Sequence, residues 1–196
     1  MKILRIDSSV RYTHSVSRQL TDELLSRLTQ QHPDAEIIVR DVAKGLPFVN
    51  EAMVAAYNTP DEDRTPEQKE ILQPSNELVA ELQAADLLVM GVPIYNFSVP
   101  APLKAYIDLV ARANLTFTYS SEGPKGLLKD RPTYIIITSG GTTVGSDIDY
   151  TSGYLKLVLG FLGIESIEII AADSLSRTGS DKLERVREQL QALPTA

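Results

Sequence analysis

The sequence predicts an α/β fold in which a parallel β-sheet carries helices on both faces. Short apolar runs rich in β-branched residues recur along the chain, and segments with helical spacing alternate with them. Two of the runs are apolar at nearly every position, as strands buried on both faces are. No internal repeat or low-complexity linker interrupts the alternation, so we expect a single domain over residues 1–196.

Five apolar runs are the expected strands. They are Lys2 to Asp7, Glu36 to Asp41, Asp86 to Val92, Thr133 to Ser139 and Glu165 to Ala171. The third run (DLLVMGV) and the fourth (TYIIIT) are nearly continuous in apolar residues, which predicts interior strands. The last run alternates polar and apolar residues over its first five positions, which predicts an edge strand.

Apolar residues at helical spacing predict the helices. The first helix has a stripe at Val16, Leu20, Leu24 and Leu28 and ends before Pro33. Three later stripes predict three more helices: Leu103, Tyr106, Ile107 and Val110; Leu155, Leu159 and Leu162; and Leu183, Val186, Leu190 and Leu193.

A further helix lies before the third strand, and its start is marked by a capping box. Thr65 is the expected N-cap, Pro66 takes the first helical position, and Gln68 stands three residues after the cap. The helix should run towards Ala85 with a kink at Pro74.

Two connections of about 20 residues are too long to be simple turns and predict lids, binding loops or partly helical segments. They are Val42 to Arg64 and Asn114 to Pro132. Residues 51–70 hold six acidic and two basic side chains, a net −4 of the total −7, which predicts a solvated flap.

Composition excludes several classes of function. The chain has no Cys, which rules out thiolate catalysis, Cys-based zinc or iron–sulfur sites and disulfides, and we expect no metal. An acidic chain without a Lys/Arg cluster is not expected to bind nucleic acid. Early charges at Lys2, Arg5 and Asp7 argue against a signal peptide, and no run reaches the roughly 18 to 20 apolar residues of a membrane span. We therefore expect a cytoplasmic protein that has no contact with a membrane.

The loop after the first strand has the composition of a phosphate site. Five of the ten residues 8–17 carry aliphatic hydroxyls, and none is Gly, which excludes a Walker loop or a Rossmann glycine turn. Hydroxyls together with the unpaired amides of a helix N-terminus form an anion site without a lysine or a metal. Such a site suits a phosphate that is bound but not transferred. Alternatively, these Ser and Thr side chains are helix caps and turn formers.

Two other loops lie at carboxyl ends of strands, where an open α/β sheet binds its ligands. Residues 93–104 read PIYNFSVPAPLK, and their two aromatic side chains and one amide suit the faces and edge of a planar heterocycle. Residues 139–142 read SGGT, where the absent Cβ lets backbone approach a ligand. Alone, each loop is equally a plain turn, but three such loops at three strand ends support one another.

With these motifs, the chain resembles the FMN-dependent NADH:quinone oxidoreductases of the azoreductase family. The resemblance is carried by SSVRYTHSVS, by PIYNFSVPAPLKAYIDLVARANLTFTY and by SGG, where the family usually has an Arg between Ser and the glycine pair. It implies a single flavodoxin-like FMN-binding domain over residues 1–196, a doubly wound five-stranded sheet in the order 2-1-3-4-5, and a homodimer with active sites at the subunit interface.

The resemblance also assigns residues. Ser9, Ser15, Val16 and Ser17 would hold the FMN phosphate; Ile94, Tyr95, Asn96 and Phe97 would border the isoalloxazine; and Ser139, Gly140, Gly141 and Thr142 would close its other side. Phe97, Tyr119 and Phe161 would be aromatic walls for the substrate.

The expected chemistry belongs to the cofactor, since no catalytic nucleophile, metal site or acid–base dyad is visible in the sequence. FMN would take a hydride from NADH and pass it to a quinone or an aromatic azo compound in a ping-pong cycle. No Lys or Arg lies between Gly141 and Leu155 to meet a 2′-phosphate, so NADPH is a less favoured donor than NADH. The alternative is a flavodoxin-like FMN electron carrier or regulatory binding module.

The segment Ala101 to Ala113 bears on assembly because it offers two apolar faces. Leu103, Ile107 and Val110 form one face, and Ala101, Ala105, Tyr106 and Leu109 form the other. A helix on its own sheet needs one such face, so the second contacts either the flap or another subunit. The resemblance favours the subunit.

Overall fold

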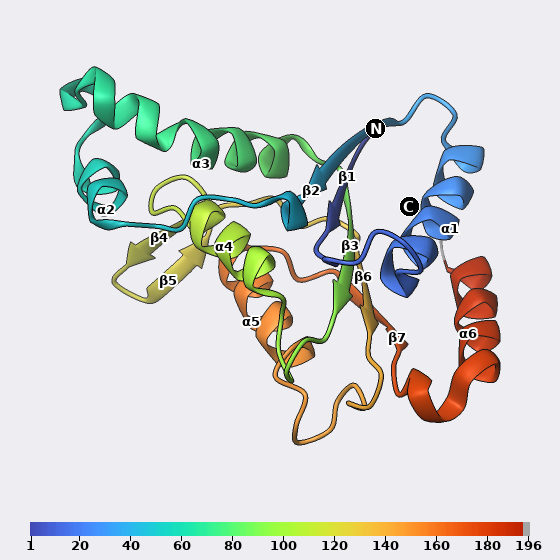
Figure 1. Ribbon diagram of the computed structural model, residues 1–196. Helices are drawn as coiled ribbons and strands as arrows, with labels where there is room; N and C mark the ends of the chain where they lie inside the picture. The colour runs from blue at the N-terminus through green and yellow to red at the C-terminus, as the bar shows by residue number, and fades with distance from the viewer. Residues whose placement is uncertain (194–196) are drawn as a thin grey trace.

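A five-stranded parallel sheet forms the centre of the protein in the computed structural model, which describes residues 1–193 (Figure 1). Its strands are β1 (Lys2–Asp7), β2 (Glu36–Asp41), β3 (Leu87–Pro93), β6 (Thr133–Thr138) and β7 (Ile167–Ala172). The order β2-β1-β3-β6-β7 confirms the predicted order of the five sheet strands. β7 lies at an edge, as its alternating sequence predicts, and β3 and β6 are buried along their whole lengths.

The side chains of the sheet alternate between two apolar cores, one on each face. Leu88 and Met90 of β3 join the core formed with α3 (Pro66–Ala84), α4 (Ala101–Val110) and α5 (Ser152–Leu162). Leu87 and Val89 face the opposite core, formed with α1 (Val16–Gln31) and α6 (Leu175–Ala192). The prediction of helices on both faces is confirmed.

The capping box of α3 is present. The Gln68 amide donates to the Thr65 hydroxyl at 3.3 Å, and the Thr65 amide donates to the Gln68 side-chain oxygen at 3.1 Å. The helix continues without a break through Pro74 to Ala84.

The connection from residue 42 to residue 64 is mostly helical. It holds the short 3₁₀ turns η1 (Val42–Lys44) and η2 (Asp61–Asp63) on either side of α2 (Glu51–Asn58). The solvated flap predicted for residues 51–70 is wrong for α2, because its apolar side chains Met53 and Ala56 are buried beside α3. The acidic side chains that suggested a flap lie on the outer surface.

The connection from residue 114 to residue 132 contains an antiparallel hairpin of β4 (Phe117–Ser120) and β5 (Gly123–Gly126) that the sequence did not predict. The hairpin packs on the C-terminal end of α5, where Gly163 ends the helix with a left-handed φ of 106°. A Cβ at Gly126 would lie 2.2 Å from the Gly163 nitrogen. Backbone therefore packs directly on backbone at this contact.

Most of the second apolar face of α4 is covered within the chain. Leu109 and Tyr106 are buried, and the Ser75 hydroxyl of α3 donates to the Leu109 carbonyl at 2.6 Å. The expectation that this face meets a second subunit is therefore wrong for Tyr106 and Leu109, because α3 already packs against α4, whereas Ala101 at the start of the helix is exposed.

The last helix, α6, returns to α1. Gly179 interrupts it with non-helical angles (φ 45°, ψ −125°), and Arg27 of α1 donates to the carbonyls of Leu190 and Leu193 near its end. Within residues 1–193, no helix combines the length and apolar character needed to cross a membrane.

Candidate functional site

The loop between β1 and α1 ends in hydroxyls that no helix cap uses. Ser15 is the N-cap of α1 by backbone conformation, yet its side chain accepts no capping hydrogen bond. Instead the Ser15 and Ser17 hydroxyl oxygens lie 3.3 Å apart, and both side chains are buried. The hypothesis that the Ser15 and Ser17 side chains cap the helix is therefore wrong, because the hydroxyls bond to each other and not to a free amide of the first turn.

Arg18 of α1 holds the backbone of this loop through a side-chain hydrogen bond. Its Nη2 donates to the Ser9 carbonyl at 2.8 Å and to the Asp41 carboxylate at 2.7 Å, and its guanidinium lies 4.5 Å from the Tyr12 ring centroid. Asp7 lies beside the same guanidinium at 3.3 Å, and burial raises the pKa of this carboxyl despite Arg5 and Arg18 nearby. A buried ion-pair network thus fixes the backbone of the loop.

The loop after β3 is a tight turn. Tyr95 and Ser98 exchange backbone hydrogen bonds of 3.0 and 3.2 Å, while Asn96 and Phe97 between them have φ of 49° and 73°. Positive φ at both central residues is the signature of a type I′ turn, and Asn tolerates it well. The Tyr95 hydroxyl reaches the Ser9 hydroxyl at 3.3 Å, which joins this turn to the first loop.

The loop after β6 is held by its own serine. The Ser139 hydroxyl donates to the Thr142 carbonyl and accepts from the Ser174 amide at 3.1 Å. The amides of Leu175 and Ser176 donate to the carbonyls of Ser139 and Gly140, so the segment after β7 lies against this loop. The Ser139 side chain therefore serves the shape of the loop.

The three loops enclose a polar cavity of about 320 Å³ at the carboxyl edge of the sheet. Its lining includes eight of the twelve residues predicted for the cofactor: Ser9, Ser15, Val16, Ser17, Ile94, Tyr95, Ser139 and Gly140. Arg11, Leu175 and Ser176 also line it and were not predicted.

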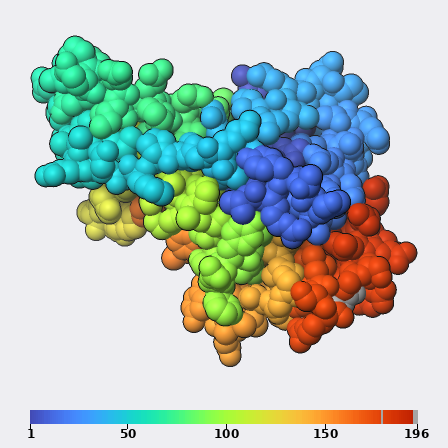
Figure 2. Space-filling view, in the orientation of Figure 1, coloured from blue at the N-terminus to red at the C-terminus, as the bar shows by residue number. Residues whose placement is uncertain are grey.

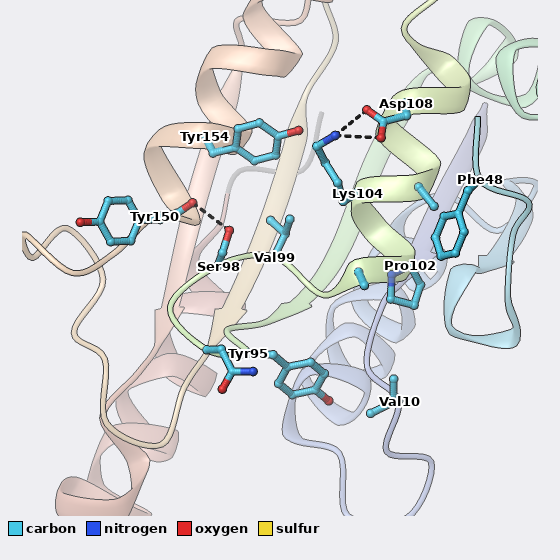
Figure 3. Close-up of a pocket in the computed structure, with 13 residues that line it drawn as sticks. Val10, Phe48, Tyr95, Ser98, Val99, Pro102, Lys104, Asp108, Tyr150 and Tyr154 are labelled. Carbon is cyan, nitrogen blue, oxygen red and sulfur yellow. Dashed lines mark hydrogen bonds and ion pairs between the residues drawn. The ribbon is translucent and has the colours of Figure 1, made fainter. Parts of the chain in front are cut away.

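A larger, mainly apolar pocket of about 920 Å³ adjoins the polar cavity, and Tyr95 lines both. Figure 3 shows Tyr154 and Lys104 at one end of this pocket and Tyr95 and Val10 at the other. Lys104 Nζ is 2.7 and 2.8 Å from the two carboxylate oxygens of Asp108, and this contact raises the pKa of Lys104. Val10, Phe48, Lys104, Asp108, Tyr150 and Tyr154 are pocket residues that the sequence did not predict.

Part of the prediction falls elsewhere. Asn96 lines the large pocket, whereas Phe97, Gly141 and Thr142 line neither cavity; Phe97 is half exposed, and its carbonyl accepts from the Tyr150 amide at 3.0 Å. Tyr119 and Phe161 flank Phe117, with ring centroids 5.4 and 4.6 Å from it. They lie at the hairpin end of α5, whereas Tyr154 lies near the start of a helix about 16 Å long.

No cluster of three metal-ligating side chains occurs in the part of the chain that the structure describes. Figure 2 shows three segments that meet on the visible face: the blue loop between β1 and α1, the cyan segment that precedes α2, and the yellow-green α4. The loop that carries Val10, the segment that carries Phe48 and the helix that carries Lys104 thus come from distant parts of the sequence and line one pocket.

Comparison with known proteins agrees with this architecture. A family model described as having a flavodoxin-like fold matches residues 1–194. An FMN-dependent NADH:quinone oxidoreductase 1 of Hahella chejuensis is 46% identical over 191 residues, covering 97% of this chain and 94% of the relative. One of Thiobacillus denitrificans is 50% identical over 173 residues, covering 88% and 84%.

Solved structures agree as well. An azoreductase from Bacillus anthracis superposes with a TM-score of 0.87 at 25% identity, covering 97% of this chain and 95% of that one. An FMN-dependent NADH-azoreductase from the same species, solved in complex with FMN, gives 0.87 at 26% identity, covering 97% and 96%.

Proposed function

This chain belongs to the flavodoxin-like family of FMN-dependent NADH:quinone oxidoreductases, and from that premise we propose that it oxidises NADH through bound FMN and reduces quinones and aromatic azo compounds. The observation that carries the proposal is the pair of adjoining cavities that share Tyr95 at the carboxyl edge of the sheet. One cavity is polar and suits a phosphate, and the other is apolar and suits planar rings.

The polar cavity fits the FMN phosphate. Ser15 and Ser17 have buried hydroxyls whose only hydrogen bond among residues 1–193 is to each other, and these can turn to donate to phosphate oxygens. The free amides at the start of α1, Val16 among them, add donors, and Arg11 brings a cation. Ser9, which lines the same cavity, would complete the set.

The ring of FMN would lie between the turn after β3 and the loop after β6. Ile94, Tyr95, Asn96 and Phe97 would supply one border, where the left-handed conformations of Asn96 and Phe97 set the direction of the peptide groups. Ser139, Gly140, Gly141 and Thr142 would supply the other, since Ser139 fixes the loop and the glycines let it approach. FMN, when bound, supplies the position that accepts and passes on a hydride.

The large pocket would receive donor and acceptor in turn. Its walls are aromatic and aliphatic, with the Lys104–Asp108 pair at one end to orient polar groups. One docking place for two planar substrates implies ping-pong turnover. We favour NADH over NADPH because the loop from Gly141 to Leu155 holds two Asp and neither Lys nor Arg.

The working enzyme would be a homodimer. Around the large pocket, Val10, Phe48, Phe97 and Tyr150 are 54%, 73%, 52% and 64% exposed, an unusual gathering of large apolar side chains. A second copy that covers this face would bury them. Its Tyr119 and Phe161, which the first chain cannot bring to its own pocket, would then be the aromatic walls over the substrate.

The experiment that tests this function uses the protein loaded with FMN under anaerobic conditions. Adding NADH alone should remove the flavin absorbance at about 450 nm, and adding a quinone should restore it. NADPH at the same concentration should act more slowly, and protein freed of FMN should show no turnover. If loss of absorbance required the quinone, the ping-pong scheme would be wrong. If neither nucleotide reduced the flavin, the protein would be an FMN electron carrier and not an NADH-oxidising enzyme.

A further inference from the structure

A third cavity, of about 750 Å³, lies away from the site described above. The end of α2, the middle of α3 and the segment that follows α4 enclose it, at the opposite end of α4 from the loop after β3 (Figure 1). Its volume is in the range of small-molecule sites. No residue of the two cavities near β1 lines it.

Arg112 is the unusual residue of this cavity. It is only 3% exposed, yet no carboxylate within residues 1–193 lies within ion-pair distance of it. Its Nη1 donates to the Ser75 hydroxyl at 2.6 Å and to the Asn76 side-chain oxygen at 3.2 Å, while Nε and Nη2 have no partner among the described residues. A buried charge without an opposite charge is costly.

Arg131 shows what a purely structural buried arginine looks like in this protein. It is 5% exposed, and carbonyls of Lys129, Leu82 and Ala85 accept from its Nε and Nη1. It lines none of the three cavities. Arg112, in contrast, lines a cavity and has both Nε and Nη2 without a partner among the described residues, where Arg131 has only Nη2. The Tyr57 ring centroid lies 4.1 Å from the Arg112 guanidinium.

Arg64 adds a second cation to the cavity. Its Nε donates to the Ala56 carbonyl at 3.0 Å, and Nη1 contacts the Asp61 carboxylate at 2.8 Å. Asp61 is 81% exposed, so water competes for this ion pair and an incoming anion can take its place. Burial lowers the pKa of Arg112, and the charge of Arg64 lowers it further, so the two cations are close enough to repel.

The other walls are apolar. Val79 and Ala80 of α3 and Leu115 after α4 line the cavity beside the Tyr57 ring. Two guanidinium groups against one carboxylate leave the lining with one net positive charge, which matches a single negative charge. A free phosphate would leave the apolar walls unused.

We propose that this cavity binds a monocarboxylate, whose carboxylate lies between Arg112 and Arg64 and whose hydrocarbon part lies against Val79, Ala80 and Leu115. The planar fork of an arginine suits a carboxylate, and the free Nε and Nη2 of Arg112 form such a fork. The site does not depend on the function proposed above, because it shares no residue with the flavin pockets.

The test is a titration of the FMN-loaded protein with benzoate, followed by NMR of the arginine Nε–H signals and by calorimetry. Benzoate should shift the signals of Arg112 and Arg64 and leave the flavin absorbance unchanged. Benzyl alcohol, which lacks the charge, and inorganic phosphate, which lacks the hydrocarbon, should each bind at least about tenfold more weakly.

Variants make the assignment specific. Arg64→Gln should weaken benzoate binding about tenfold, and Arg112→Met should abolish it. Arg187→Gln, on α6 and paired with Glu23, should bind like the unchanged protein. If Arg112→Met fails to fold, Arg64→Gln and the NMR shifts still decide. The proposal is overturned if benzoate leaves both arginine signals unmoved, if phosphate binds as well as benzoate, or if the flavin absorbance shifts instead.

Discussion

The hydroxyls of Ser15 and Ser17 are buried at the start of α1 without capping it. Side chains in such a position normally satisfy a free amide of the first turn. Here they turn towards one another and towards the polar cavity, which leaves the amides available as well. The residues are arranged for a ligand with several acceptor oxygens.

The double variant Ser15→Ala/Ser17→Ala should therefore bind FMN more weakly. Each hydrogen bond to a charged group contributes roughly 1.5 to 3 kcal/mol, which is about tenfold to a hundredfold in the dissociation constant. Titration of protein freed of FMN, followed by fluorescence, measures the change. Ser26→Ala, at an exposed position on the same helix, is the control. Equal affinities in all three proteins would remove the phosphate assignment.

Asp130 makes a local and testable contribution to stability. Its carboxylate accepts from the Ser166 hydroxyl and amide and from the Glu165 amide at 2.6 to 2.9 Å, which holds its pKa at about 2. Because this pKa lies below that of the unfolded chain, the stabilisation is present at pH 7 and is lost as pH falls towards 2.

Asp130→Asn should accordingly lower the melting temperature at pH 7 by a few degrees. The difference from the unchanged protein should shrink as the carboxylate protonates between pH 4 and about 2. Thermal unfolding at a series of pH values measures it. A difference that stayed constant down to pH 2 would mean that the charge of Asp130 plays no part.

At this scale, the sequence could identify residues that stand beside a strand end and carry the right chemical groups, as Ser9, Ser15 and Tyr95 do. It could not find Phe48 or Tyr154, because they reach the large pocket from the connection before α2 and from α5, far along the chain. Ser176 could have been predicted from the sequence, because it follows the fifth sheet strand and ligands bind beyond the carboxyl ends of the strands.

The β4–β5 hairpin is the element that the sequence concealed. Its strands have four residues each, and one of them reads GPKG, which carries no strand signal. The hairpin is held by tertiary contact, chiefly by the approach of Gly126 to Gly163 and by the Leu128 amide, which donates to the Leu162 carbonyl at 3.0 Å. Longer elements with clear periodicity, such as α1 and β6, could be predicted to within one or two residues.

Gly126→Ala should separate the hairpin from α5. The new Cβ would meet backbone at 2.2 Å, and such overpacking costs typically about 1 to 3 kcal/mol. Because Phe117 and Tyr119 are on the hairpin, the variant should also change turnover with bulky azo substrates if Tyr119 contacts them.

Gly160→Ala, in the neighbouring turn of α5, is the matched control. A Cβ there meets nothing within 4 Å, and Ala favours a helix over Gly by about 1 kcal/mol. Urea unfolding should therefore show a lower free energy of unfolding for Gly126→Ala and a higher one for Gly160→Ala, each relative to the unchanged protein. Two variants of equal stability would mean that the close approach of Gly126 to Gly163 is not tight.

For the whole molecule, we propose that the apolar rim of the large pocket is the dimer contact. Phe48→Asp/Tyr150→Asp should prevent dimerisation, since both exposed side chains would lie in that contact and would bury two charges there. Sedimentation should give a dimer for the unchanged protein and a monomer for the variant, which should keep its FMN affinity but lose most quinone turnover.

Val39→Asp is the control for that experiment, because Val39 is also exposed and lies on edge strand β2 away from the pocket. It should remain dimeric. If the unchanged protein sediments as a monomer with full turnover, each pocket is complete within one chain and the dimer is unnecessary.

The contacts of Arg27 with the last turn of α6 determine which side of the protein is suited to attachment to a solid surface. They hold Leu193 beside the C-terminal half of α1, at the edge of the sheet where β1 begins. Met1 lies at that edge too, since its carbonyl accepts from the Glu36 amide at the start of β2. The two adjoining cavities proposed for FMN and its substrates lie at the carboxyl ends of the strands, on the opposite side of the sheet. A linker at Met1 or next to Leu193 could thus anchor the enzyme on an electrode with its pockets turned to the solution.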